Sequence, residues 1–379
     1  MINRERILNE FYELVQVDSE TKHEEAISVV LKQKFGELGL QVVEDDTREV
    51  TGHGSGNLIC TLEATPGHEA APAVFFTGHM DTVVPGNGIK PRLDDDGFIR
   101  SDGTTILGSD DKAGLAAMFE AIRVLKEQNI AHGKLLFVIT AGEESHLIGS
   151  RSMKPGTFQA DYGYALDCNG SIGEMCTQGP THAQIKIKIY GKAAHAGVSP
   201  ESGISAIQVA SKAISRMPLG RVDHETTANI GRFEGGTETN VVCDYVYITA
   251  EARSLKDDKL AVQVDKMRKA FEETAEEFGA RVEFDSHVIY PAYHFDNDSQ
   301  VVRVAFQALE QIGLKGSTFK SGGGSDVNMF NGLGIPSINL SVGYEDIHTT
   351  KERIKADDIV KLTEFVVAII QESVKEKKA

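Results

Sequence analysis

The stretch AVFFTGHMDT, residues 73–82, places a histidine and an aspartate shortly after an unbroken apolar run. Such a run, bounded by a turn residue, is typical of a buried β-strand. His79 is therefore a possible metal ligand, and Asp81 can accept the other ring N–H and fix the tautomer. An isolated His-x-Asp pair is more often structural, so the prediction of a metal site depends on what else reaches the same place.

Further acidic and imidazole side chains follow other apolar runs. Glu143 and Glu144 come after KLLFVIT, Asp167 follows DYGYA, and His348 follows SINLSVGYEDI. In an open α/β sheet, ligands bind beyond the carboxyl ends of the strands. We therefore expect these side chains to meet at one edge of the sheet.

Asp110 stands at the entry to a helix in LGSDDKAG, where the helix dipole favours an anion. Each acid also has an ordinary explanation: Asp110 as a helix cap, GEES as an acidic turn, and Asp167 as a solvated loop residue. Caps and solvated loops should be spread over both edges of a sheet, whereas these clusters all fall on one edge. Their common location favours a shared function.

Several carboxylates that face one another raise each other's pKa, so they cannot all stay ionised without a cation. Two histidines with several acids suit zinc first, with cobalt or manganese as substitutes. The ligands outnumber what one tetrahedral ion needs. The sequence therefore predicts two zinc ions per chain, about 3.5–4 Å apart and sharing one carboxylate, which is typical of a hydrolase.

The elements that must position these residues divide the chain into two kinds of domain. Strand-like runs alternate with amphipathic helical patterns at both ends of the chain, which predicts a doubly wound, mainly parallel α/β sheet. The middle follows the order strand, helix, strand, strand, helix, strand, which is ferredoxin-like. We expect a discontinuous catalytic domain over 1–178 and 292–379, and an inserted lid or dimerisation domain over 179–291.

Two local patterns mark the insert. In HAQIKIKIYG, residues 182–191, isoleucine alternates with lysine, which predicts a strand with one buried and one wet face. This strand would be either an open edge suited to pairing across a dimer or a wet edge blunted by its lysines. Ser199 as a cap and Pro200 at the first position predict a helix over 200–216.

Composition excludes several classes of function. The net charge of −17, from 39 basic and 56 acidic residues, repels polyanions, so we expect no nucleic acid or membrane partner. The N-terminal stretch lacks the apolar core of a signal peptide, and no apolar run is long enough for a bilayer, so we expect a cytoplasmic protein. The four cysteines form no C-x-x-C pair and are interpreted as reduced thiols.

Nine motifs resemble, in order, those of the co-catalytic zinc peptidases and acylases: GHMDT, LGSDDKAG, AGEES, ALD, GKAAHAG, TETNVV, EARS, GGGSD and IHTTKERI. This family includes peptidase T, glutamate carboxypeptidases, acetylornithine deacetylase and succinyl-diaminopimelate desuccinylase. The resemblance covers nearly the whole chain. ILGSDDKAG and GIPSINLSVGYEDIHTT look closest to peptidase T-like tripeptide aminopeptidases.

The resemblance implies which residue binds which ion. His79 and Asp167 would hold one zinc, Glu144 and His348 the other, and Asp110 would bridge the two. These assignments come from the family, because the spacing alone does not separate the ligands of one ion from those of the other.

The resemblance also implies roles beside the ions. Glu143 would be the general base, and Asp81 would orient His79. Since Glu143 and Glu144 are adjacent, spacing alone does not decide which of them is the base. The peptide bond between Asp110 and Asp111 would be cis.

The insert is expected to contribute to substrate binding. By resemblance, His195 would stabilise the oxyanion, and Asn240 with Arg253 would hold the substrate, Arg253 at its terminal carboxylate. A strand-end turn residue is the other interpretation of His195. In some relatives this histidine comes from the partner subunit, which suggests a homodimer through the insert. SGGGSD, which contains Gly323, lacks the lysine of a P-loop and is interpreted as backbone lining the substrate cleft.

These expectations combine into a di-zinc exopeptidase that acts on short peptides and releases the N-terminal residue of tripeptides. One alternative keeps the metal site but acts on N-acylated amino acids, or as a carboxypeptidase. Another is a non-catalytic binding protein that retains the fold.

Overall fold

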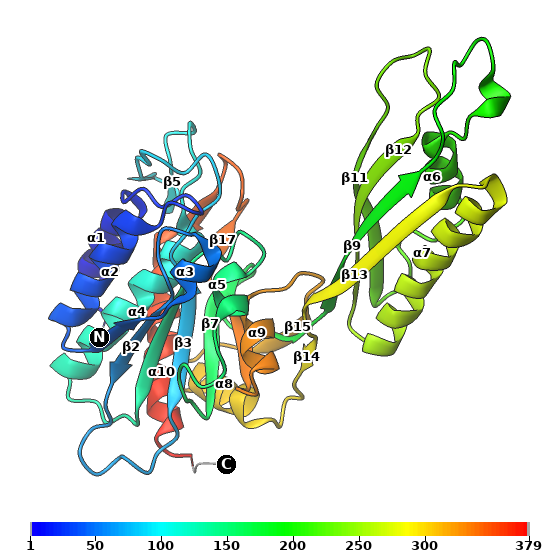
Figure 1. Cartoon of the computed structure of the whole chain (residues 1–379). Coiled ribbons are helices and arrows are strands. Elements are labelled where there is room, and N and C mark those ends of the chain that lie inside the picture. Colours follow the sequence, from blue (N-terminus) through cyan, green and yellow to red (C-terminus); the bar gives the residue numbers. More distant parts are fainter. Residues whose placement is uncertain (1, 377–379) are drawn as a thin grey trace. The chain divides into compact units, whose positions relative to one another are not determined.

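The computed structural model describes residues 2–376, which form two compact units (Figure 1). The first unit comprises the described residues up to Gln178, with His294–Lys320 and those from Ser325 onward. The second comprises Gly179–Tyr293 and Ser321–Gly324. Within the described part of the chain, no helix combines the length and apolar character needed to cross a membrane.

The first unit is built on a nine-stranded sheet whose centre is parallel. Four neighbouring strands run in the same direction, which confirms the predicted mixed α/β class. In their order across the sheet they are β6 (Leu135–Thr140), β3 (Val74–His79), β7 (Tyr162–Cys168) and β16 (Ser337–Ser341).

The flanking strands depart from this parallel arrangement. β2 pairs antiparallel with β6, and β8 pairs antiparallel with β16. The flanking strands are β1 (Gln41–Glu44), β2 (Leu58–Leu62), β8 (Glu174–Gly179), β14 (Tyr293–His294) and β15 (Ser317–Lys320). The parallel core that positions the strand ends is therefore limited to the middle of the sheet.

Both faces of β3 are buried because helices cover both faces of the sheet. Val74 and Phe76 point into the larger core, whereas Phe75 packs edge-on against Phe158 and Phe330, with ring centroids 5.3 and 5.1 Å away. Alternate residues of a strand point to opposite faces, so a strand covered on both faces must be apolar throughout. This explains the unbroken run before His79.

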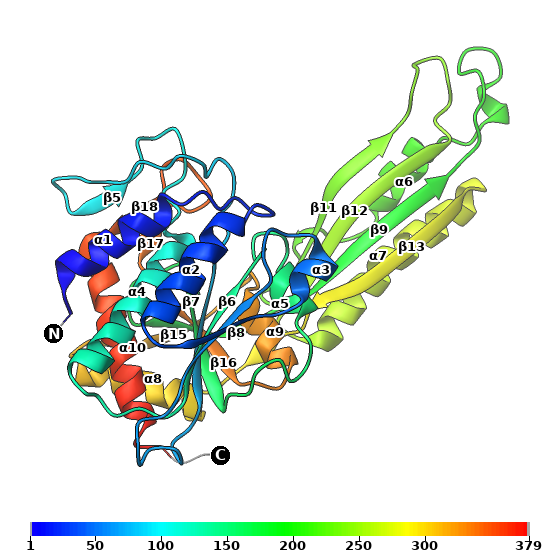
Figure 2. The same cartoon turned by 60° about the vertical axis from the view of Figure 1, so that its left-hand side comes forward.

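The helices divide between these two faces (Figure 2). Five contribute to the larger core: α1 (Arg4–Val15), α2 (Glu25–Glu37), α4 (Ser109–Glu127), α8 (Gln300–Gln311) and α10 (Ala356–Ser373). Three shorter ones lie on the other side: α3 (Thr47–Thr51), α5 (Ile148–Ser152) and α9 (Asp326–Gly332). A small sheet of β17 (Tyr344–Glu345), β18 (Arg353–Lys355), β5 (Phe98–Arg100) and β4 (Arg92–Leu93) completes the unit.

The second unit is an antiparallel sheet with two helices on one face. Across the sheet the strands are β10 (Gly220–Arg221), β11 (Thr226–Gly235), β12 (Tyr245–Ser254), β9 (Thr181–Tyr190) and β13 (Arg281–Tyr290). The helices are α6 (Ala206–Ser215) and α7 (Asp257–Phe278). Ile185, Ile187 and Ile189 are fully buried beneath them, so the predicted alternation is present.

Two local expectations in this unit are wrong. β9 is not an edge strand, because it pairs with β12 on one side and with β13 on the other. Its lysines mark a wet face of an interior strand, since alternation reports exposure of a face and not of an edge. The helix predicted from residue 200 begins at Ala206, where the Ser205 hydroxyl accepts the Gln208 N–H at 3.3 Å. Pro200–Ser202 forms a separate 3-10 turn.

Candidate metal centre

The polar residues after three neighbouring strands lie at the same edge of the large sheet. His79 is the last residue of β3, Asp167 is the last but one of β7, and Glu143 and Glu144 follow β6. These strands are adjacent and parallel, so their carboxyl ends coincide. The topology thus explains why residues far apart in the sequence converge.

The two oxygens of Asp110 face two different imidazoles. Oδ1 lies 3.0 Å from Nε2 of His79, and Oδ2 lies 3.3 Å from Nε2 of His348. His79 Nε2 is also 3.8 Å from Asp167 Oδ1, and His348 Nε2 is 2.9 Å from Glu144 Oε1. The structure therefore brings together all five residues that the sequence suggests as ligands, with Asp110 in the middle.

Asp110 reaches this position from an irregular start of α4. Gly108 has a φ of 73°, in the left-handed region that glycine tolerates, and Asp110 and Asp111 have non-helical backbone angles. The peptide bond between Asp110 and Asp111 is cis, as the resemblance implies. Gly78 lies against this turn, because a Cβ built there would be only 2.0 Å from Asp111 Oδ2.

The tautomer of His79 is fixed by the backbone of Asp81. Nδ1–H of His79 donates to the main-chain oxygen of Asp81 at 2.9 Å, whereas the Asp81 carboxylate lies at 3.5 Å. That carboxylate accepts the N–H groups of Glu143 and Glu144, at 3.0 and 3.2 Å. Asp81 thus orients His79 mainly through its carbonyl, and its side chain holds the turn that carries the two glutamates.

The donor set fits a divalent cation. With Nδ1 as the donor, the lone pair on Nε2 of a neutral His79 points at the oxygens of Asp110 and Asp167, an arrangement that needs a positive charge between them. Burial alone would lower the pKa of His79, but hydrogen bonds to Asp110 and Asp81 raise it well above its usual range. Imidazole nitrogens with carboxylate oxygens are the ligands that zinc, cobalt and manganese accept. Ligand atoms of His79, Asp110 and Glu144 all lie within 4.8 Å of one another.

The remaining acids of the cluster have a raised proton affinity. Burial, followed by the negative charge of Asp167, raises the pKa of Glu143 well above its usual range. Burial and the charge of Asp110 do the same for Asp167. The more exposed His348 has its pKa raised to about 10 by hydrogen bonds to Asp110 and Glu144. A cation at the centre would remove the repulsion that these shifts report.

Several residues around the centre could not be assigned from the sequence. The Tyr344 hydroxyl donates to Asp167 Oδ1 at 3.1 Å, and Asn339 donates to the Asp167 carbonyl at 2.6 Å. Buried Lys112 donates to the carbonyl of Met80 at 2.7 Å. Tyr344 and Lys112 lie inside motifs quoted above, which was the available signal, but their partners are distant in the sequence.

The second unit places its suggested substrate residues in two groups. His195 and Asn240 are on adjacent loops, since the Ala196 N–H donates to the Asn240 carbonyl at 2.9 Å. His195 Nδ1 accepts the Gly197 N–H at 3.2 Å, so Nε2 carries the proton in the neutral ring. Both His195 and Asn240 are exposed.

Arg253 lies at the other end of the same unit. It is the last residue but one of β12, whereas Asn240 precedes the start of that strand. Ten residues at ~3.3 Å each separate the two ends by roughly 30 Å. Arg253 donates from Nε and Nη2 to Glu251, at 3.1 and 3.0 Å. Gly323, whose N–H donates to the Ser321 hydroxyl, is exposed. The structure thus brings His195 and Asn240 together but separates them from Arg253.

Comparisons with known proteins agree on one family. A model described as peptidase family M20/M25/M40 matches residues 75–372. The chain is 57% identical to the uncharacterized protein YqjE of Bacillus subtilis over 375 residues, covering 99% of this chain and 100% of that one.

Two solved structures are similar over the whole chain. The aminopeptidase PepT from Bacillus cereus is 59% identical with a TM-score of 0.92, over 99% of this chain and 100% of that one. A tripeptidase from Staphylococcus aureus is 48% identical with a TM-score of 0.95, over 99% and 100% of the two chains.

Proposed function

Because the chain belongs to peptidase family M20/M25/M40, we propose that it is a metallo-exopeptidase that binds two zinc ions and releases the N-terminal residue of tripeptides. The similarity to an aminopeptidase and to a tripeptidase, each aligned over the full chain, supports the substrate class. Cobalt or manganese would be substitutes for zinc.

The observation that carries the proposal is the position of the Asp110 carboxylate between two imidazoles. One oxygen faces His79 with Asp167 beside it, and the other faces His348 with Glu144 beside it. This supports two ion sites that share Asp110. A carboxylate that faces a different imidazole with each oxygen is suited to bridge two ions.

In the proposed mechanism, bound divalent ions would polarise the scissile carbonyl and make water a stronger acid. Glu143 takes a proton from the attacking water and delivers it to the nitrogen of the leaving amine. The C–N bond breaks, the acyl carbon gains the hydroxyl, and the amine gains the proton. Burial, the main cause of the raised pKa of Glu143, increases its proton affinity, which suits a group that first accepts and then donates that proton.

Asp81 and Tyr344 would act by positioning. The Asp81 carboxylate accepts both N–H groups of the turn that carries Glu143 and Glu144, so it sets where the base and its neighbouring ligand point. The Tyr344 hydroxyl restrains Asp167. Such contacts to ligand residues fix geometry that the ligands alone would leave free.

We propose that the second unit is a lid and dimerisation domain that supplies the substrate contacts. His195 presents an Nε2–H suited to an oxyanion, Asn240 lies beside it, Arg253 suits a terminal carboxylate, and Gly323 would line the cleft with its backbone. A tripeptide spans only about 10 Å when extended. Since His195 and Arg253 lie at opposite ends of one sheet, one chain does not offer both groups to one tripeptide, which supports a homodimer.

A substrate panel tests the proposal directly. Purified protein with added zinc is given tripeptides, dipeptides, and N-acetyl and N-succinyl amino acids, and the products are separated and identified. We expect tripeptides to be cleaved with release of the N-terminal residue. Hydrolysis of the N-acyl amino acids alone would replace the peptidase by an acylase with the same metal site, and release of the C-terminal residue would indicate a carboxypeptidase.

A further inference from the structure

Glu352 is a buried carboxylate that the proposed mechanism does not use. It lies four residues after His348, just before β18, and is 1% exposed. A buried carboxylate is unfavourable unless hydrogen bonds or positive charge compensate it. Its partners therefore indicate what it is for.

All four hydrogen bonds that its carboxylate accepts come from Leu107–Asp110, the residues that form the Asp110 turn. Oε2 accepts the N–H groups of Leu107 and Gly108, both at 2.8 Å. Oε1 accepts the Ser109 hydroxyl at 2.6 Å and the Asp110 N–H at 3.1 Å. A carboxylate offers about four lone-pair positions, so its capacity is filled.

These donors need a partner outside the helix. The first N–H groups of a helix have no acceptor in the preceding turn, and here the backbone of Asp110, with φ −86° and ψ 99°, is not helical. Glu352 supplies the acceptors for this irregular turn. The shape of the turn, and with it the direction of the Asp110 side chain, therefore depends on a residue about 240 positions later.

We propose that Glu352 is a positioning residue that locks the Asp110 turn to the segment carrying His348 and so sets the separation of these two ligands. The segment that carries His348 and Glu352 contacts the Asp110 turn through both of these residues. His348 Nε2 lies 3.3 Å from Asp110 Oδ2, and Glu352 holds the Asp110 backbone. This inference rests on the proposed metal centre, because it assigns Glu352 a role in metal affinity and not only in stability.

The test is a titration of the metal-free full-length chain with Co²⁺, followed by visible absorption. Glu352→Gln keeps the shape of the side chain but places an NH₂ group against N–H donors. We expect it to bind Co²⁺ about 10- to 100-fold more weakly than the wild type and to give an altered absorption spectrum.

Glu120→Gln is the matched control. Glu120 is also in α4, is 0% exposed, and accepts a backbone N–H, that of Asn3, at 3.0 Å, but it lies ten residues from Asp110. The control should keep the wild-type Co²⁺ affinity and spectrum even if its melting temperature falls. Equal weakening in both variants would mean that Glu352 only stabilises α4, and would overturn the inference.

Two further results are decisive. Wild-type affinity and spectrum in Glu352→Gln would also overturn the role of Glu352 while leaving the proposed function intact, whereas a wild-type chain that binds no Co²⁺ would contradict both. If Glu352→Gln does not fold, Ser109→Ala removes one of the four hydrogen bonds. We then expect a several-fold loss of Co²⁺ affinity in Ser109→Ala, and an unchanged affinity would overturn the inference.

Discussion

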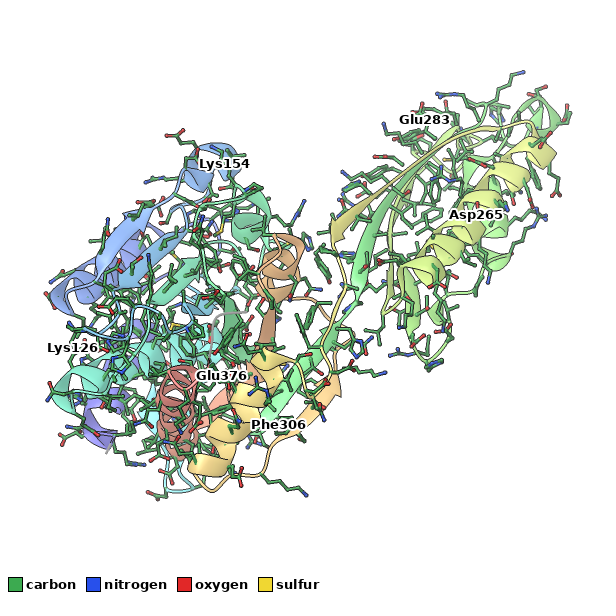
Figure 3. The ribbon with its side chains drawn as sticks, turned by 90° about the horizontal axis from the view of Figure 1, so that it is seen from below. Lys126, Lys154, Asp265, Glu283, Phe306 and Glu376 are labelled. Carbon is green, nitrogen blue, oxygen red and sulfur yellow. The ribbon has the colours of Figure 1, made fainter. Side chains whose placement is uncertain are left out.

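Acidic residues lie in opposite environments on the surface of the second unit and at the sheet edge of the first. In the second unit, Asp265 of α7 and Glu283 of β13, both labelled in Figure 3, have half-exposed side chains paired with Lys269 and Arg281. In the first unit, Asp81 and Asp111 at the sheet edge are 0% exposed, and neither carboxylate oxygen of Asp111 has a hydrogen-bond partner.

The acids on the surface of the second unit are neutralised by neighbouring basic side chains, whereas the buried acids at the sheet edge of the first unit repel one another. A surface pair of Lys or Arg with Asp or Glu is complete in itself and contributes little to stability. Buried acids that face one another carry a high free energy unless protons or cations join them. The sheet edge of the first unit is therefore suited to bind a cation, whereas the charged pairs of the second unit maintain a solvated surface.

Substitution of Glu143, the proposed base in the first unit, should have the greatest effect. Glu143→Gln removes the proton carrier but keeps the side-chain volume, so tripeptide turnover should fall by roughly 10²- to 10⁴-fold. Metal content per chain, measured by plasma emission spectroscopy, should stay at the wild-type level. Glu13→Gln, at an exposed site on α1, is the control and should change neither quantity. Unchanged turnover would remove Glu143 as the base.

Removing the bound cations should destabilise the first unit and leave the second unit unaffected. At a free zinc concentration 100 times Kd, binding stabilises the native state by about 2.7 kcal/mol, and a chelator removes this contribution. In hydrogen exchange, we expect faster exchange around His79–Asp81 and Glu143–Glu144 and unchanged exchange in β9 and β12. Equal loss of protection in both units would contradict the contrast between them.

Arg253→Lys probes the second unit. An ammonium group cannot reproduce the planar arrangement of guanidinium N–H donors, so KM for a tripeptide should rise about 10-fold, with kcat and metal content nearly unchanged. Arg232→Lys, at an exposed arginine of β11 that pairs with Glu234, is the control and should leave KM unaltered. A fall in metal content in Arg253→Lys would show that Arg253 affects metal binding and not only substrate binding.

The smallest effect concerns Glu251 and depends on pH. The His182 imidazole, whose Nε2 lies 3.2 Å from Glu251 Oε2, and the two hydrogen bonds from Arg253 lower the pKa of Glu251 to about 2. The carboxyl in an unfolded chain has a pKa of about 4.3, so this group stabilises the fold above that pH and loses its contribution as pH falls toward 2.

We therefore expect Glu251→Gln to lower stability by less than about 1 kcal/mol at pH 7, because the side chain is 35% exposed. The difference in melting temperature from the wild type should narrow as the pH is lowered from 5 to 2. A difference that stays constant over this range would show that the ion pair does not contribute.

The convergence of the proposed ligands could be predicted from the sequence because it follows from strand direction. His79, Glu144 and Asp167 each come directly after or near the end of an apolar run, and the ends of parallel strands coincide whatever the side-chain details. The strand itself is equally accessible, because the apolar run in AVFFTGHMDT corresponds to β3, at Val74–His79.

Hydrogen bonds between distant segments could not be predicted. The sequence suggests that the Asp81 carboxylate accepts the ring N–H of His79, but in the structure it accepts the N–H groups of Glu143 and Glu144. These two donors come close to Asp81 only in the folded chain. The edge position expected for β9 failed for a related reason: alternation in one strand reports which face is wet, not which strands lie beside it.

An anomalous-difference map from crystals grown with zinc would show whether the proposed ligands hold two ions. We expect two peaks about 3.5–4 Å apart, one next to His79 and Asp167, the other next to Glu144 and His348, with Asp110 between them. A map without a peak at these residues, while zinc is present in the crystal, would contradict the proposed metal centre.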